Sequence, residues 1–459
     1  MRRRLTEETV LFVSVLKWFV LATVTGAIVG VSTAIFLKAL AFAIGFAGRV
    51  PYTFLILPAA LPFSVLLVRW LAPDAAGHGT EKVIEAIHTT SGKIKAAVVP
   101  VKLIATIVTL ASGGSAGKEG PCAQIGAGLA SLLADLLRLS DHDRRKIVIC
   151  GISAGFASVF GTPVAGAIFG VEVLFVGSIL YEILLPSFIA GVTAYQVSLA
   201  LGVQYFAHSL VLVPVVSERS LIVVAFAAVF LGLCSFLLVE TLRAGEHLAG
   251  KLTVPPLVKS LIGGSVLAAL GCIPASRRFL GLGLETIELS LKGAPVPWYG
   301  FAAKAVFTSI TLNFGGSGGI VTPIFFVGAT AGSLFANVFG LDRATFAAIG
   351  LVALLAGAAN TPIAAAIMAL EMFGPKLGPY AAVACVISFL MTGHRSVYPS
   401  QVLAMRKSPS LDVEIGKGMD DLQATLRPRR KSIMFTVLRW RKSRREKGGE
   451  PRQTPPGAS

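Results

Sequence analysis

The sequence predicts an all-α polytopic membrane protein built from two homologous halves with broken, tilted helices. Only 14% of its 459 residues are charged, whereas 54% are hydrophobic. Soluble domains carry about 25% charged residues, so this composition indicates a lipid environment. Several apolar runs also approach or exceed the roughly 20 residues that a spanning helix needs. Finally, two motifs recur in the same order about 200 residues apart.

The apolar runs give the predicted helices in chain order. The main runs are 10–46, 210–239, 254–275, 346–359 and 381–391. The last two are short for a bilayer, and we expect them to form broken helices buried inside the protein, which membrane proteins tolerate where backbone lines a cavity.

The N-terminal run could be read as a signal peptide, because Arg2, Arg3 and Arg4 precede it. However, residues 10–46 exceed the roughly 7–15 residues of a signal-peptide core and include Lys17. A first membrane helix is therefore the favoured interpretation.

The net charge of +17 is concentrated near the C-terminus, where residues 427–447 contain ten Lys or Arg and one Glu. Such a run could bind nucleic acid, but it follows the last apolar segment, which favours contact with anionic lipid. We expect a transmembrane domain over 1–410 and a basic, largely disordered cytoplasmic tail over 411–459. With a basic N-terminus, both ends are predicted to be cytoplasmic, in a bacterial plasma membrane.

The five cysteines are isolated in apolar surroundings: Cys122, Cys150, Cys234, Cys272 and Cys385. They show no spacing typical of a metal site, and we expect free buried thiols. A metal site is therefore not expected. Neither a cofactor nor an enzymatic activity is predicted.

The repeat divides the membrane domain into halves of about 15–200 and 210–410. Residues 114–121 match 316–323, and 162–172 match 361–371 at nearly the same offset. Duplicated halves of membrane transporters commonly meet around a site near the bilayer midplane, marked by glycine- and proline-interrupted segments.

Those segments, 112–121 and 315–323, suit an anion site. Glycine-rich stretches that lead into helices expose backbone N–H groups with no intrahelical partner, and the helix dipole adds to their attraction for an anion. Pro121 and Pro323 fit the first helical turn. Close helix packing in lipid could also explain glycine clusters, but it does not explain the charge embedded in the first segment.

That charge is Glu119, and an intramembrane carboxylate is costly enough to suggest a function. Ionised, it would compete with an anion; protonated, it could swing away, so that one residue would act as gate and proton carrier. A structural ion pair with Lys118 is the alternative, although adjacent helical residues point apart.

These motifs identify the sequence as resembling the CLC family of chloride channels and chloride/proton exchangers, over nearly the whole membrane domain. The family's first signature, usually Gly-Ser-Gly-Ile-Pro, is modified to Gly-His-Gly-Thr-Glu at 77–81. The second is intact at 117–121, followed by Gln-Ile-Gly at 124–126. The third is Gly-Ile-Val-Thr-Pro at 319–323, and Pro-Val-Lys at 100–102 also matches the family.

The resemblance implies a CLC-like fold, a homodimer with one path per subunit, and specific residue roles. Glu119 matches the external gating glutamate. The remaining anion contacts are implied for Tyr398, whose hydroxyl would donate to a central anion, and for residues whose backbone or side chain would line the path: His78, Gly79, Lys118, Gly120, Ile320 and Val321. For Tyr398, an interfacial anchor is the alternative.

Two departures from the family pattern bear on mechanism. His78 replaces a serine that coordinates the central anion in many members, so pH-sensitive conduction is expected if it lines the path; it could instead be a turn histidine facing water. Val173 replaces the internal proton-transfer glutamate. The neighbouring Glu172 and its repeat partner Glu371 are predicted to be structural helix-end acceptors.

The family's paired nucleotide-binding CBS domains are not expected, because only about 60 residues follow Tyr398. The favoured function is chloride/proton exchange, and intact Glu119 and Tyr398 support it. A passive chloride channel is the alternative favoured by Val173, and a non-transporting scaffold leaves Glu119 unexplained. Pro121 favours chloride, whereas His78 leaves fluoride open.

Overall fold

The computed structural model describes residues 2–205, 217–420, 422 and 425–426, with side chains described from residue 7 onward. The α-helices are α1 (Arg2–Ala47), α2 (Leu57–Leu71), α3 (Thr80–Thr90), α4 (Val98–Ala111), α5 (Glu119–Leu136), α6 (Asp141–Phe160), α7 (Pro163–Glu172), α8 (Tyr181–Ala200), α9 (Glu218–Lys251), α10 (Pro256–Gly271), α11 (Leu284–Leu291), α12 (Gly300–Asn313), α13 (Val321–Phe339), α14 (Arg343–Ala359), α15 (Pro362–Phe373) and α16 (Gly378–Met391). Short 3-10 helices are η1 (Thr53–Ile56), η2 (Pro73–Ala75), η3 (Pro274–Phe279) and η4 (Pro375–Leu377), and two-residue strands are β1 (Phe175–Val176), β2 (Val402–Leu403), β3 (Leu411–Asp412) and β4 (Thr425–Leu426).

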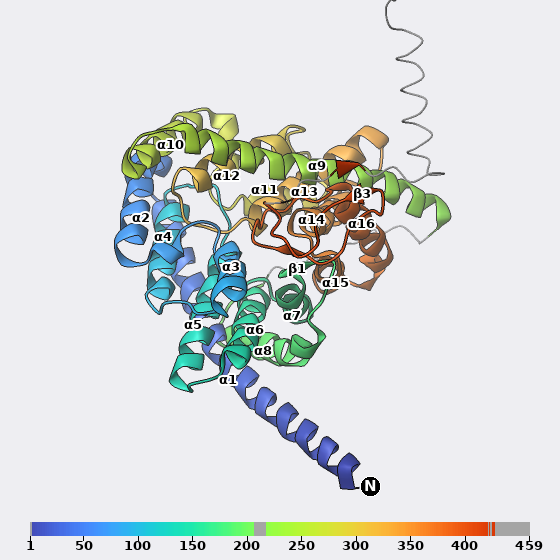
Figure 1. Cartoon of the computed structure of the whole chain (residues 1–459). Helices are drawn as coiled ribbons and strands as arrows, with labels where there is room; N and C mark the ends of the chain where they lie inside the picture. Colours follow the sequence, from blue (N-terminus) through green and yellow to red (C-terminus); the bar gives the residue numbers. More distant parts are fainter. Residues whose placement is uncertain (1, 206–216, 421, 423–424, 427–459) are drawn as a thin grey trace, which may run out of the picture.

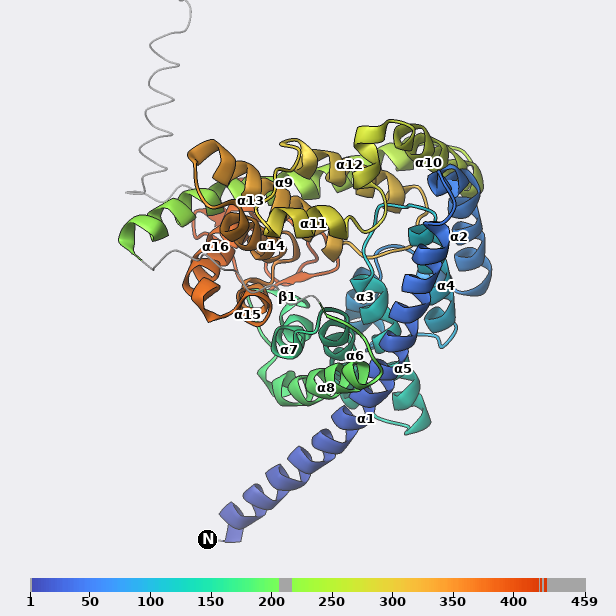
Figure 2. The ribbon, with the colours of Figure 1, turned by 180° about the vertical axis from the view of Figure 1, so that it is seen from behind.

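Long apolar helices lie outside and shorter ones fill the centre, as the apolar runs predict. Helix α1 runs without a break from Arg2 to Ala47 and projects beyond the bundle (Figure 1), which favours a membrane helix over a signal peptide. Figure 2 shows α1 crossing the back of the molecule beside α2 and α4. In contrast, α14 is buried from Thr345 to Ala359, so the predicted broken, buried helix at 346–359 is confirmed.

The two halves contact one another through reciprocal hydrogen bonds. The N–H of Ser115 donates to Thr311 Oγ1 at 2.9 Å. The N–H of Ser317 donates to Thr109 Oγ1 at 3.0 Å. Both members of each matched pair differ by 202 positions. This reciprocity shows that the sequence repeat is also a structural repeat, with a local twofold relation between the halves.

A second reciprocal pair joins α7 to α15. Glu172, at the end of α7, accepts hydrogen bonds from the N–H groups of Ile363 and Ala364 at 3.0 and 2.8 Å. Glu371, near the end of α15, accepts from Val164 and Ala165 at 2.9 and 2.8 Å. Each carboxylate therefore satisfies the N-terminal donors of the other helix. The prediction that Glu172 and Glu371 are helix-end acceptors is confirmed.

The chain after α16 folds back against the helices. Strand β2 pairs in parallel with β1, and β3 pairs antiparallel with β4. A small apolar cluster fixes this segment: Val176, Phe389, Leu403, Val413 and Met419. The first residues of the predicted tail 411–459 are thus ordered as the β3–β4 hairpin, whereas the basic run 427–447 lies outside the described residues.

The cysteines are free, as predicted. Burial is confirmed for Cys122, Cys150, Cys234 and Cys385, but Cys272 is exposed, just after α10 ends. The expectation that Cys272 is buried is therefore wrong; a break between helices places it at the surface.

We predict that Glu371→Ala lowers the free energy of unfolding by about 2 kcal/mol, because two backbone donors at the start of α7 lose their acceptor. Thermal unfolding of the detergent-solubilised protein measures this. Glu288→Ala is the control, since Glu288 is exposed and pairs with Lys292 on the same helix. Equal melting temperatures for Glu371→Ala and the wild type would contradict the assigned role.

Candidate functional site

The site begins where the two repeated glycine segments pair. The N–H of Gly117 donates to the Gly319 carbonyl at 2.7 Å, and the N–H of Gly319 donates to the Gly117 carbonyl at 2.6 Å. This antiparallel bridge brings the start of α5 and the start of α13 together near the centre of the protein. The sequence predicted that these two segments converge, and the geometry confirms it.

Glycine is required at this junction by close backbone approach. A Cβ added at Gly319 would lie 2.6 Å from the nitrogen of Gly120. Added at Gly120, it would clash with the carbonyl of His78, and added at Gly79, where φ is +83°, it would clash with the Gly120 carbonyl. The loop at 77–80 therefore packs directly on the first repeated segment, which in turn contacts the second at Gly319.

Glu119 is the first residue of α5, and its side chain reaches across to α13. It is 1% exposed. The backbone N–H of Thr322 donates to Glu119 Oε2 at 3.1 Å, and the Thr322 hydroxyl donates to Oε1. The first N–H groups of a helix have no intrahelical acceptor and attract anions. The carboxylate thus occupies a place that suits a free anion.

The structure gives no support to an ion pair between Glu119 and Lys118. Lys118 is partly exposed, and within the described residues no ion pair joins it to Glu119. The structural ion-pair interpretation therefore loses its support. Thr322 is the partner that the sequence analysis missed, although its place in the repeated motif, one residue before Pro323, was a usable signal.

Tyr398 approaches the same region from the segment after α16. It is 1% exposed, and its N–H donates to Ser396 Oγ at 2.9 Å. Its hydroxyl lies near the Thr80 side chain but makes no hydrogen bond of regular geometry within the described residues. A buried hydroxyl in this state has capacity to donate to a ligand.

His78 lies in the loop that contacts Gly120, and its Nδ1 is buried without a hydrogen-bond partner among the described residues. The loop is fixed by Lys102, whose Nζ donates to the carbonyls of Ala75 and Gly77 at 3.1 and 2.6 Å.

The second half repeats this lysine. Lys304 Nζ donates to the carbonyls of Phe279 and Gly281 at 3.1 and 2.8 Å. Lys102 and Lys304 are both fully buried, and they differ by the same 202 positions as the glycine motifs. Lys304 was missed in the sequence because no recognised signature surrounds it.

The structure thus brings together every backbone segment of the predicted site, which includes Gly79, Lys118, Gly120, Ile320 and Val321. Val173, which the family resemblance aligns with an internal proton-transfer glutamate, is fully buried and apolar, and its carbonyl accepts a hydrogen bond from Gln401 Nε2 at 2.7 Å. A side chain of this kind carries no proton.

Comparisons with known proteins bear on the family and the fold. The family model described as voltage gated chloride channel matches residues 54–393. A chloride/fluoride channel protein from Pseudomonas syringae pv. tomato is 37% identical over 405 residues, covering 87% of this chain and 89% of that protein. The crystal structure of a CLC-type fluoride/proton antiporter matches with a TM-score of 0.81 and 27% identity, covering 84% of this chain and 98% of that one. A slow cyanobacterial Cl⁻/H⁺ antiporter shares the fold, with a TM-score of 0.71 at 22% identity, over 82% of this chain and 94% of that one.

We predict that Thr322→Val strengthens halide binding about tenfold, because the competing Glu119 carboxylate loses a charge-assisted hydrogen bond worth about 1.5–3 kcal/mol. Calorimetric titration of the purified protein measures the affinity. Thr330→Val is the control, since the Thr330 hydroxyl bonds only to backbone carbonyls of its own helix α13. Weaker halide binding in Thr322→Val would mean that the hydroxyl serves the anion instead.

Proposed function

The chain belongs to the voltage-gated chloride channel family, and on that premise we propose that it transports small anions in exchange for protons, with Glu119 as gate and proton carrier. The observation that carries the proposal is the Glu119 carboxylate on the first turn of α13. The chemistry is transport through a membrane, and no covalent step is involved.

The exchange follows from competition for one place. Ionised Glu119 occupies the donors at Thr322, so an anion cannot bind there at the same time. Protonation removes the negative charge and weakens these hydrogen bonds, because neutral acceptors bind about half as strongly as charged ones. The neutral side chain then leaves and an anion enters. The movement of protons is thereby coupled to the movement of anions in the opposite direction.

The anion itself is held by backbone N–H groups. We assign an outer site to the amides of Lys118, Glu119 and Gly120, and a central site to those of Ile320 and Val321. Neutral amides bind a halide without the tight trapping of a full positive charge, so that the ion can leave again.

The Tyr398 hydroxyl, which has donor capacity to spare, completes the central site. The loop residues His78 and Gly79 line it from the opposite segment, where they contact Gly120. In these assignments each repeated half contributes one helix start to the anion path, and the loop before α3 lines its third side.

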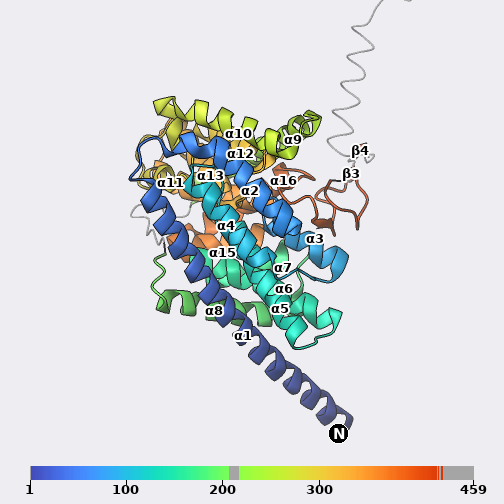
Figure 3. The ribbon, with the colours of Figure 1, turned by 90° about the vertical axis from the view of Figure 1, so that its left-hand side faces the viewer.

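The membrane arrangement follows from charge and surface. Figure 3 shows the N-terminal end of α1, helix α3 and the β3–β4 hairpin toward one side of the molecule. We place this side in the cytoplasm of a bacterium, with the basic sequence 427–447 on anionic lipid. The halves 15–200 and 210–410 then form one transport domain.

We further propose that the chain forms a homodimer. Exposed apolar side chains lie on the neighbouring helices α7, α8, α15 and α16, which suit a second copy; they include Val164, Leu185, Val192, Ile363, Leu370 and Val386. Each subunit has its own path, because the cradle at Gly117 and Gly319 is complete within one chain.

Two alternatives rest on single residues. Val173 has no proton to give, which favours a passive channel in which Glu119 only gates. His78 replaces the usual serine, and relatives named for fluoride transport are similar to this chain, which favours fluoride as the anion.

We predict that the wild type, reconstituted in liposomes, has an anion-flux reversal potential that moves with the pH gradient. Glu119→Gln should carry anions with a reversal potential indifferent to pH, because a neutral amide neither competes with the anion nor carries a proton. Glu288→Gln, on the exposed surface, should behave as the wild type does.

If the wild-type reversal potential ignored pH, the exchanger proposal would fail and the passive channel would stand. If Glu119→Gln folded but passed no anion, the gate role itself would fail. Size-exclusion chromatography of each variant establishes that it is folded.

We predict that His78→Ser shifts selectivity toward chloride and flattens the pH dependence of anion flux. Imidazole gains a charge on protonation and then holds an anion harder, whereas serine does not titrate. Burial lowers the pKa of His78 to about 4, so chloride and fluoride fluxes measured from about pH 3 to pH 7 test both effects. Unchanged selectivity and pH profile would mean that His78 faces water away from the path.

A further inference from the structure

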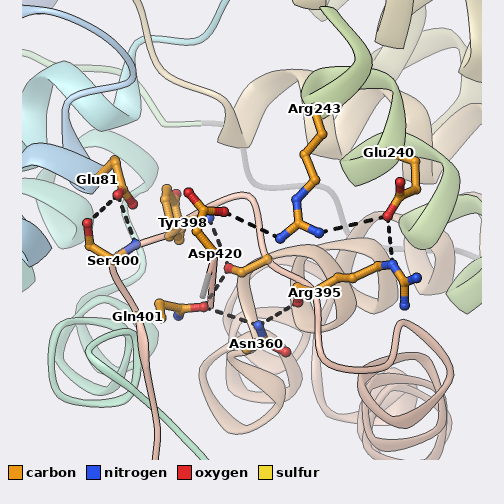
Figure 4. A network of polar contacts seen from close by, with 10 residues as sticks. Glu81, Glu240, Arg243, Asn360, Arg395, Tyr398, Ser400, Gln401 and Asp420 are labelled. Carbon is orange, nitrogen blue, oxygen red and sulfur yellow. Dashed lines mark hydrogen bonds and ion pairs between the residues drawn. The ribbon is translucent and has the colours of Figure 1, made fainter. Parts of the chain in front are cut away.

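A second carboxylate lies within electrostatic range of Tyr398. Glu81 is the second residue of α3, a helix of 11 residues that is too short and too polar to span a bilayer. Figure 4 shows Glu81 beside Ser400 and Tyr398. The sequence analysis passed over Glu81 as the last position of a modified signature motif.

The two oxygens of Glu81 have different surroundings. Oε1 accepts hydrogen bonds from the N–H of Ser400 at 2.9 Å and from the Ser400 hydroxyl at 2.5 Å. Oε2 is buried and has no partner among the described residues. Leaving a buried carboxylate oxygen unpaired is costly. This oxygen is therefore where a proton or a water molecule would bind.

Glu81 is linked to the anion path through its neighbours. Thr80, the preceding residue, lies near the Tyr398 hydroxyl, and Ser400 follows Tyr398 by two positions. The Tyr398 hydroxyl is within electrostatic range of both Glu119 and Glu81. Tyr398, which we assign to the central site, is therefore close enough to interact with both carboxyl groups.

The charges around Glu81 favour its protonated form. Glu85 lies on the same helix and Asp420 on the C-terminal segment, where it pairs with Arg243 of α9 at 3.6 Å. Burial raises the pKa of Glu81 to about 7, these negative charges add to the increase, and the Ser400 hydrogen bonds oppose it. The group thus gains and loses a proton near neutral pH, as transport requires.

We propose that Glu81 is the residue that exchanges the transported proton with the solution on the side of the C-terminal segment, in place of the carboxylate missing at Val173. This inference rests on the proposed function of Glu119. A hydronium ion from that side gives its proton to Oε2 of Glu81 and becomes water. The proton then passes through water to the Glu119 carboxylate, and Glu81 returns to its ionised form.

The competing explanation is a structural one, in which Glu81 only ties the segment around Ser400 to α3. Both roles use the Ser400 bonds, but only proton exchange needs a group that titrates. Glu81→Gln keeps an amide oxygen that accepts from the Ser400 N–H, and it removes the titration. A purely structural role would therefore survive this substitution.

The experiment measures proton and anion fluxes together in liposomes containing wild type, Glu81→Gln or Glu288→Gln. Glu288 is the control because it is an exposed carboxylate on α11 that pairs with Lys292 and is not among the charges that act on Glu81. We expect Glu81→Gln to lose at least nine-tenths of proton transport while anion flux persists, and Glu288→Gln to keep the wild-type ratio of protons to anions.

Normal coupling in Glu81→Gln would overturn the inference while leaving the role of Glu119 intact; loss of coupling in the wild type would instead overturn the proposed function. If Glu81→Gln does not transport at all, Ser400→Ala tests the inference instead. It removes one hydrogen bond that stabilises the ionised carboxylate, so the pH of half-maximal proton transport should rise by about one unit. An unchanged pH profile in Ser400→Ala would then overturn the inference.

Discussion

The hydrogen bonds from Thr322 to the Glu119 carboxylate are the interaction on which the rest of the site depends. They place a negative group where the starts of α5 and α13 converge, against the first-turn N–H of Thr322. The Gly117–Gly319 bridge sets the spacing, and residues with a Cβ at Gly120 or Gly319 would force the segments apart. Glu119, whose charge changes with protonation, is thereby held at a rigid backbone junction where it competes with the anion.

Duplicated contacts between the two halves make the site rigid, and the difference between the halves at its centre gives the site its function. Reciprocal pairs of threonine and glutamate contacts join the halves so that each supports the other, as in the exchange between Glu172 and Glu371. At the centre the repeat is broken, since Val321 stands where the other half has Glu119. Only one of the two helix starts can therefore carry a proton.

The sequence was sufficient to predict the two glycine segments at Gly117 and Gly319, but not the hydroxyl side chains that bond to the carboxylates. The glycine and proline motifs identified both segments, because close backbone approach requires glycine at particular positions in the sequence. Thr322 was missed although it lies in the repeated motif next to Pro323. Ser400 was missed because a hydroxyl that reaches a carboxylate across 319 positions leaves no local pattern. Burial of Cys272 was predicted from its apolar neighbours, but helix ends decide exposure. The β3–β4 hairpin went unpredicted because two-residue strands carry no periodicity.

The central claim is that the Glu119 carboxylate stands in the anion's place. Anomalous diffraction from crystals of Glu119→Gln grown in bromide tests it most directly. The account predicts a bromide peak within hydrogen-bonding distance of the Thr322 N–H, where the carboxylate lies in the wild type. Bromide bound elsewhere, with this position filled by the glutamine side chain or by water, would contradict it.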